Sequence, residues 1–167
     1  VLTVWASRCA GCVDSVRVDM GPPLLRPSEI PVNVEGERCI KLPIEVAGRR
    51  LELTCISMGN PHAVIFDNRL GLSEFVLVGP AIERHPLFPD RVNVHAAAIE
   101  SRSEVTMRSW ERGSGLTQAC GTGACAVLVA GVLEGRLDRT ALVHLPGGEL
   151  VVEWPDLSDG SLGSVFM

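Results

Sequence analysis

Residues 121 to about 134 predict a helix that is apolar on every side. A helix without a polar face has to be enclosed by the rest of the chain. Because the remaining pattern is dominated by strands, the sequence predicts an α+β fold, in which a curved, mostly antiparallel sheet wraps around one long buried helix. Residues 124–133, the longest apolar run, are too few to cross a bilayer, so we expect no membrane partner.

The other elements follow from alternating apolar residues and from the turn residues between them. The segments expected as strands are residues 1–6, 13–20, 40–46, 50–57, 63–66, 92–101, 103–110, 141–145, 149–154 and 162–167. Turns at residues 8–11, 47–48 and 101–102 predict two hairpins and a further pair of strands. Residues 76–85 predict a short helix, and Gly135 predicts the end of the long one.

The composition is that of a globular protein, with 46% hydrophobic and 21% charged residues among 167. The net charge is −5 and no cluster of lysine and arginine occurs, so we expect no nucleic-acid partner. Six cysteines without a secretory signal pattern favour a reducing compartment, and we expect a cytoplasmic protein. Cys9 and Cys12 form a lone C-x-x-C motif without a second pair, so we expect no metal site there.

Cys120 stands where a Gly-rich turn enters the apolar helix. Unpaired backbone N–H groups and the positive end of the helix dipole are expected to favour its thiolate. Gly121 and Gly123 leave the same N–H groups open to a carboxylate, so one segment offers a base and an anion cradle, as chemistry on an amino acid requires. The competing interpretation is packing alone, because cysteine is among the most buried residue types. We expect that structural role for Cys125, five residues further on.

Two further groups of polar residues accompany this turn. Glu111 and Arg112 precede it, and Asn60, His62 and Asn93 lie beside predicted strand ends. Asn60 alone is equally typical of an ordinary turn, and Asn93 alone is more often a turn residue. Together, the amides, the guanidinium and the helix N–H groups are suited to binding carboxylate and ammonium groups.

Several motifs in this order and spacing resemble those of the diaminopimelate epimerase family. They are Ser57-Met58-Gly59-Asn60-Pro61-His62, Arg91-Val92-Asn93, Trp110-Glu111-Arg112-Gly113 and Gln118-Ala119-Cys120-Gly121-Thr122-Gly123-Ala124-Cys125, with weaker matches at residues 18–21 and 145–148. The resemblance runs from about residue 13 to residue 167. Proline-racemase-like relatives share the Cys-Gly-Thr-Gly turn but lack the Glu-Arg-Gly lead-in and the Gly-Asn-Pro-His loop.

The resemblance implies inversion at the α-carbon of LL-diaminopimelate to give the meso form, a step of lysine biosynthesis. The family uses two cysteines as acid and base, with neither pyridoxal phosphate nor metal, so the implied cofactor is none. Cys120 would be one of the two cysteines, and Glu111 would adjust its protonation. His62 would do the same for the other cysteine.

The resemblance also implies which residues hold the substrate. Gly121 and Thr122 would offer backbone N–H groups to its α-carboxylate. The side chains that would bind the rest of it are Asn60, Asn93 and Arg112, with Glu111 near its ammonium group. The implied partner is the small molecule diaminopimelate.

The sequence departs from the family pattern in three places. The family's first catalytic cysteine lies in a Cys-Gly-Asn-Gly turn, which this sequence lacks. We therefore expect residues 1–20 to be the last strands of a truncated N-terminal domain and residues 21–167 to be the C-terminal epimerase domain, carrying one of the two bases. Surface left uncovered by that first domain would favour a homodimer.

The other two departures are smaller. Residues 163–167 resemble a final strand cut short. His95 and Ala96 stand where the family usually has Asn or Gly and then an aromatic residue.

Three alternatives stay open. The first is a racemase of another amino acid, which would share the acid–base chemistry but not the substrate. The second is a non-catalytic ligand-binding module derived from the epimerase. The third is a metal or redox protein built on Cys9 and Cys12.

Overall fold

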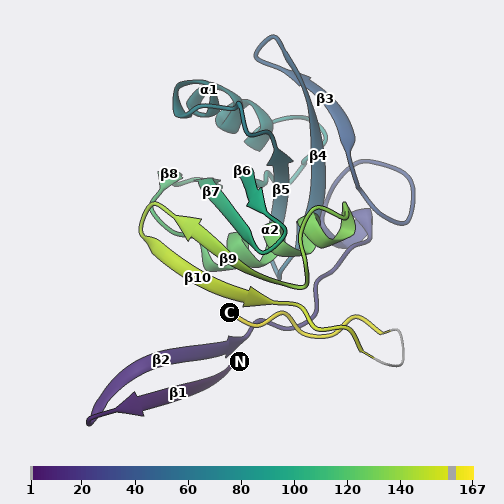
Figure 1. The fold of residues 1–167 in the computed structure, drawn as a ribbon. Coiled ribbons are helices and arrows are strands. Elements are labelled where there is room, and N and C mark those ends of the chain that lie inside the picture. The colour runs from purple at the N-terminus through teal and green to yellow at the C-terminus, as the bar shows by residue number, and fades with distance from the viewer. Residues whose placement is uncertain (1, 158–160) are drawn as a thin grey trace.

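A curved sheet packs around helix α2 (Gly121–Leu133) in the computed structural model (Figure 1), which describes residues 2–157 and 161–167. The strands of this sheet follow the order β10-β9-β7-β6-β5-β4-β3, and β8 pairs with the C-terminal end of β7. Neighbouring strands are antiparallel except for the parallel pairs β5–β6 and β7–β9. The expected α+β fold, with a mostly antiparallel sheet around a buried helix, is confirmed.

The other elements comprise ten strands, a second α-helix and one short 3-10 helix among the described residues. In chain order the strands are β1 (Thr3–Cys9), β2 (Cys12–Asp19), β3 (Leu42–Val46), β4 (Arg49–Ser57), β5 (Pro61–Phe66), β6 (Asn93–Ser101), β7 (Glu104–Glu111), β8 (Gly115–Thr117), β9 (Thr140–Leu145) and β10 (Gly148–Glu153). The second α-helix is α1 (Leu72–Glu83), and Pro27–Glu29 form the 3-10 helix.

Helix α2 is enclosed on all sides, as its composition requires. Residues 124–130 are fully buried, and the helix contacts β4, β5, β6, β9 and β10. Apolar burial of this kind is the main favourable term in folding. Among the described residues, neither helix is long and apolar enough to span a membrane.

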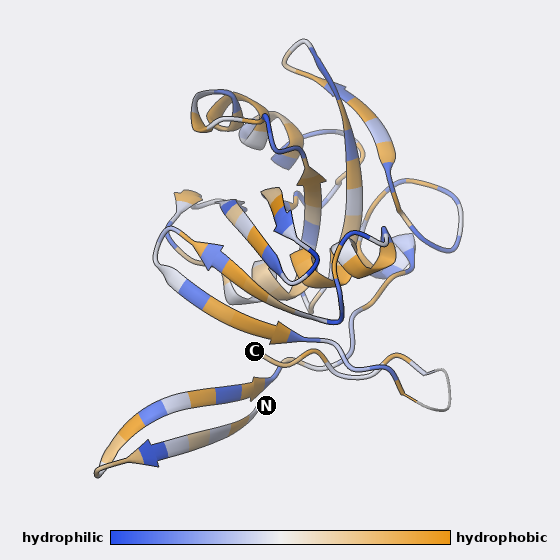
Figure 2. Ribbon diagram, viewed as in Figure 1, coloured by the Kyte–Doolittle hydropathy of each residue, from blue (hydrophilic) through white to orange (hydrophobic). Residues whose placement is uncertain are grey.

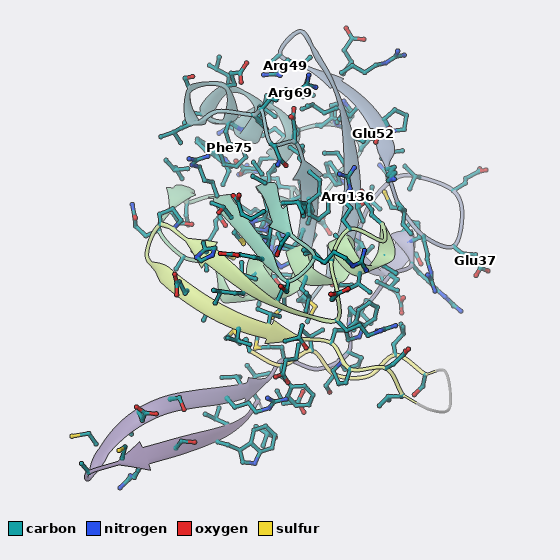
Figure 3. The ribbon with its side chains drawn as sticks, viewed as in Figure 1. Glu37, Arg49, Glu52, Arg69, Phe75 and Arg136 are labelled. Atoms are coloured by element: carbon teal, nitrogen blue, oxygen red, sulfur yellow. The ribbon has the colours of Figure 1, made fainter. Side chains whose placement is uncertain are left out.

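The sheet lies between α2 and α1, and β5 shows how its residues divide between the two faces. Val64 packs in the cluster around α2, whereas Ala63 and Ile65 pack in the cluster around α1. This is the alternation expected of a strand that is buried on both faces. Phe75, labelled on α1 in Figure 3, is fully buried in the second cluster. Two layers of core therefore fix the strand ends that carry the polar residues of the expected site.

The hairpin β1–β2 projects from this body (Figure 1). Figure 2 shows apolar segments along it, and Val4, Trp5, Val13 and Val16 are each about half exposed. Its base is joined to the C-terminal segment, because the backbone groups of Val18 and Met167 hydrogen-bond each other at 2.7 and 3.1 Å.

Most predicted strands are confirmed, with ends that shift by a few residues; Val1, the expected start of the first strand, lies outside the described residues. The expected strand 162–167 is wrong, because Phe166 alone forms bridges, with Glu153 and Asp19. Its neighbours Val165 and Met167 bond to other partners, so no continuous ladder forms. The three-residue strand β8 was not predicted, and residues 158–160 of the C-terminal region lie outside the described residues.

Helix α1 begins at Leu72, four residues before its expected start. Gly71 caps it, and its backbone N–H donates to the Glu74 carboxylate at 3.2 Å. This satisfies one of the N–H groups that a helix start leaves unpaired. With this cap, the helix begins about one turn before the apolar run from which it was predicted.

A core truncation tests the enclosure of α2. Leu128→Ala is expected to lower the free energy of unfolding by about 2–5 kcal/mol, because it removes a fully buried side chain and leaves a cavity. Urea titration measures this loss. The control is Leu77→Ala on α1, where the side chain is 64% exposed, with an expected change below about 1 kcal/mol. Equal losses in the two variants would contradict the enclosure.

Candidate active site

Cys120 is the N-cap residue of α2. Its backbone is extended, with φ −145°, and its carbonyl accepts the first helical hydrogen bond from Ala124 N at 2.9 Å. The side chain is 6% exposed. The sequence correctly predicted a cysteine at the start of an apolar helix, and the sulfur lies where helix N–H groups converge.

The charge state of Cys120 differs from the expectation. Burial raises the pKa of the thiol, hydrogen bonds from Thr122 and from the Gly123 backbone lower it, and the Glu111 carboxylate raises it again, so that the net pKa lies above the ordinary value. The Gly123 N–H acts in the predicted direction, but the expected thiolate is not the form of the free site. Desolvation of an anion outweighs the helix N–H groups here. Cys120 is a thiol at neutral pH.

The Glu111 carboxylate is held beside this thiol at the end of β7. Its Oε1 accepts a hydrogen bond from Thr117 Oγ1 on β8 at 2.6 Å. The turn that follows is fixed by Glu83 of α1, which accepts from Trp110 Nε1 at 2.8 Å and from Gly113 N at 3.0 Å. Burial raises the pKa of Glu83, but these two donors and the nearby arginines lower it by a larger amount. The net pKa is below the ordinary value, so Glu83 is ionised. Sequence reasoning missed Glu83, because its role depends on where α1 packs.

His62 lies in the interior, on β5. Its Nε2 is 2.9 Å from Asn60 Oδ1, and its Nδ1 is 2.8 Å from His95 Nε2. Both rings are fully buried. Burial lowers the pKa of His95 to about 3. Burial, and then repulsion between the protonated forms of His62 and its neighbours His95 and Arg112, lowers the pKa of His62 well below its ordinary value. Both rings are therefore neutral at pH 7.

Asn60 connects this histidine pair to the helix start. Its Nδ2 is 3.4 Å from Thr122 Oγ1, which in turn is 3.7 Å from Cys120 Sγ. The structure thus joins Asn60, His62, Thr122 and Cys120 in one hydrogen-bonded group. His95, which the sequence marked only as a departure, belongs to the same group.

Asn93 and Arg112 lie next to it. Asn93 Nδ2 donates to the Pro61 carbonyl at 2.9 Å, and its Oδ1 accepts from Arg112 N at the same distance. The buried amide of Asn93 therefore ties the His62 loop to the Glu111 turn. The Arg112 side chain is exposed, and its Nη1 donates to the Asp90 carbonyl at 2.8 Å.

The two glycines after Cys120 allow close approach for different reasons. A Cβ at Gly123 would lie 2.4 Å from His95 Cε1 and 3.0 Å from Cys120 Sγ. A Cβ at Gly121 would meet only the flexible end of Met167, at 3.0 Å from its Cε. Gly123 is therefore required by packing, whereas at Gly121 only the flexible end of Met167 lies against the helix start.

The other cysteines lie elsewhere. Cys9 and Cys12 are exposed on the projecting hairpin, Cys39 and Cys55 are buried in the cluster around α1, and Cys125 is fully buried within α2. Burial raises the pKa of Cys125 to about 12, which agrees with a structural role. Within the described residues, no group of three or more histidine, cysteine or acidic side chains is placed to hold a metal ion.

Comparison with known proteins shows the family of the chain. A sequence model described as diaminopimelate epimerase matches residues 54–165. The chain belongs to the diaminopimelate epimerase family. Among curated members, the diaminopimelate epimerase of Desulfitobacterium hafniense is 48% identical over 92% of this chain, and that of Nostoc punctiforme is 50% identical over 85% of it. The chain spans about half the length of these relatives, 54% and 52% respectively.

Two solved structures of other proteins share the fold of this diaminopimelate epimerase family member. A hydroxyproline epimerase from Agrobacterium vitis, with bound trans-4-hydroxy-L-proline, aligns with 99% of the chain at a TM-score of 0.69 and 19% identity. A probable proline racemase from Agrobacterium radiobacter aligns with 99% of it at a TM-score of 0.65 and 17% identity. The chain covers 52% and 53% of these proteins.

Neutralising Glu111 tests the electrostatics of Cys120. Glu111→Gln removes the negative charge that raises the pKa of the thiol but keeps an acceptor for Thr117, so alkylation of Cys120 by iodoacetamide at pH 8 should accelerate roughly three- to tenfold. Mass spectrometry of the Cys120 peptide separates its rate from that of exposed Cys9 and Cys12. The control is Glu35→Gln, the same charge change at an exposed loop residue. An unchanged or slower rate in Glu111→Gln would contradict the assignment.

A pair of glycine substitutions tests the packing of the helix start. Gly123→Ala is expected to lower the free energy of unfolding by about 1–3 kcal/mol, because the added methyl group collides with the His95 ring. Gly121→Ala should cost less, since the end of Met167 can move aside. Urea titration compares the two variants. An equal or larger loss in Gly121→Ala would show that the packing is not as described.

Proposed function

We propose that this chain forms one half of the active site of a diaminopimelate epimerase, which converts LL-diaminopimelate to the meso form for lysine biosynthesis. The observation that carries the proposal is the Cys120 thiol, held at the start of α2 between the Thr122 hydroxyl and the Glu111 carboxylate. Membership of the family supports the same conclusion. The half-site needs no cofactor for acid–base chemistry of this kind, because a thiol and a thiolate suffice.

The raised pKa of Cys120 suggests its role in each direction. A thiol is the form that delivers a proton to the α-carbon, so Cys120 acts as the acid when the second cysteine removes the proton from the opposite face. In the reverse direction the Cys120 thiolate takes the proton and the second cysteine returns one. Each turnover therefore moves one proton off and one proton on, and leaves the pair of cysteines with the same total number of protons.

Substrate binding would change the electrostatics around Cys120. The N–H groups of Gly121 and Thr122 at the start of α2 are suited to the α-carboxylate. The substrate ammonium beside Glu111 would offset the carboxylate charge that raises the pKa of Cys120. Asn60, Asn93 and the exposed Arg112 supply the remaining polar groups. In this way the substrate itself would bring the thiol closer to its reactive form.

We also propose that the second base belongs to a separate domain. The five other cysteines lie outside the Cys120 site. Residues 1–20 are assigned to the last strands of an N-terminal domain and residues 21–167 to the C-terminal epimerase domain. The half-exposed Val4, Trp5, Val13 and Val16 of the hairpin support this division, because apolar side chains of this kind are usually covered.

A cytoplasmic location is the last part of the proposal. The six cysteines of the chain all lie among the described residues, and all six are free thiols. Free thiols persist in a reducing compartment.

Protection of Cys120 from alkylation tests the function. LL-Diaminopimelate at millimolar concentration is expected to slow alkylation of Cys120 at least threefold, because its carboxylate would occupy the helix start beside the sulfur. Cys9, exposed on the hairpin, is the internal control and should be unaffected. L-Lysine, which lacks the second carboxylate, and L-proline should protect less. Equal protection by proline would favour a racemase of another amino acid, and no protection by any of them would overturn the proposal.

The same samples test the single base. Incubated with LL-diaminopimelate in heavy water, the chain is expected to form no meso product, because inversion needs an acid and a base on opposite faces. Chiral chromatography measures the product. Appreciable meso product that disappears in Cys120→Ser would show that the chain contains a second base.

A further inference from the structure

A continuous series of hydrogen bonds runs from the interior of the sheet to the sulfur of Cys120. It passes through β7, β6, β5, the loop before β5 and the start of α2. Its members are Ser109, His95, His62, Asn60, Thr122 and Cys120. His95 and Ser109 have no place in the proposed function, yet both are buried and both occupy the inner end of the series.

The orientation of the Asn60 amide fixes which nitrogen of each ring carries hydrogen. Asn60 Oδ1 can only accept, so His62 Nε2, 2.9 Å away, donates to it. The Nδ1 of a neutral His62 is then bare and needs a donor, which His95 Nε2 supplies at 2.8 Å. The bare Nδ1 of His95 in turn accepts from the Ser109 hydroxyl at 3.0 Å. With the Asn60 amide in this orientation, only this arrangement of hydrogens satisfies every ring nitrogen of the pair.

The same arrangement decides where the Thr122 hydroxyl hydrogen points. Asn60 Nδ2 donates to Thr122 Oγ1 at 3.4 Å, so the hydroxyl oxygen already serves as an acceptor. The Thr122 hydrogen is then available to Cys120 Sγ, 3.7 Å away, where it stabilises a thiolate. The opposite tautomer of His62 would require the Asn60 amide to rotate. Asn60 Oδ1 would then face Thr122 and take the hydrogen that Cys120 needs.

We propose that His95 is a positioning residue, whose Nε2–H holds His62 in one tautomer and thereby directs the Thr122 hydrogen toward Cys120. His95 is fully buried and packs against Gly123, so its ring is also fixed under the start of α2. It acts through its neighbours and does not touch the substrate. The inference rests on the proposed role of Cys120 as an acid–base group.

The tautomers of the two rings give the first test, which needs no substitution in the series. Nitrogen-15 NMR of the histidine-labelled chain at pH 7 is expected to show His62 and His95 neutral, with hydrogen on Nε2 in both. Single variants His85→Gln and His144→Gln assign the two remaining histidines. Hydrogen on Nδ1 of His62 would overturn the proposal, because the series would then run in the opposite direction.

The second test compares two substitutions of His95. In His95→Gln the side-chain NH2 group can take the place of Nε2–H, whereas His95→Leu fills space without a donor. Alkylation of Cys120 between pH 7 and 10 should shift to higher pH in His95→Leu, with a rate at pH 8 about three- to tenfold lower. His95→Gln should stay within about twofold of the original chain, because it restores the donor.

The outcomes separate a positioning role from a structural one. A merely structural His95 predicts the same alkylation profile in both variants, and that result would overturn the proposal. Proton–nitrogen spectra show whether each variant is folded, and an unfolded His95→Leu is replaced by Ser109→Ala, which removes the donor to His95 Nδ1. These measurements use no substrate, so failure of diaminopimelate to protect Cys120 would overturn the proposed function and leave the tautomer result to stand on its own.

Discussion

The burial of α2 is the constraint on which the rest of this structure depends. A helix that is apolar on every side can only be placed inside the protein, and the sheet curves around it to supply that interior. Its N-terminus must nevertheless satisfy unpaired N–H groups, and Cys120, Gly121 and Thr122 leave them facing a partly open site. The interior helix therefore places a buried sulfur and the N–H groups of a helix start at one point.

Burial has a cost for acid–base chemistry, and the surrounding residues show how it is offset. Desolvation holds Cys120 in the thiol form, and Glu111 adds to that effect. Hydrogen bonds from Thr122 and Gly123 act in the opposite direction. Under the proposed function, a substrate charge beside Glu111 would shift this balance. Cys125, five residues further along α2, lacks the hydrogen bonds from Thr122 and Gly123, and burial keeps it protonated.

The sequence predicted the features that depend on local chemistry. The Ala47-Gly48 turn defined the hairpin β3–β4, and the apolar run after Cys120 defined α2. The pKa of Cys120 could not be predicted, because it depends on burial and on a carboxylate nine residues earlier that the sheet brings close. His95 and Glu83 were missed for the same reason, since their partners come from other elements. The C-terminal segment failed as a strand because its successive residues bond to different parts of the fold.

A structure of the chain with LL-diaminopimelate bound tests the central claim most directly. We expect the α-carboxylate on the N–H groups of Gly121 and Thr122, with the α-carbon against Cys120 Sγ and the ammonium group beside Glu111. A hollow of about 400 Å³ is lined by Leu72, Leu116 and His144 among others, and by Thr117, the partner of Glu111, but not by Cys120, Gly121 or Thr122. Binding of the ligand in that hollow, with the start of α2 left free, would contradict the claim.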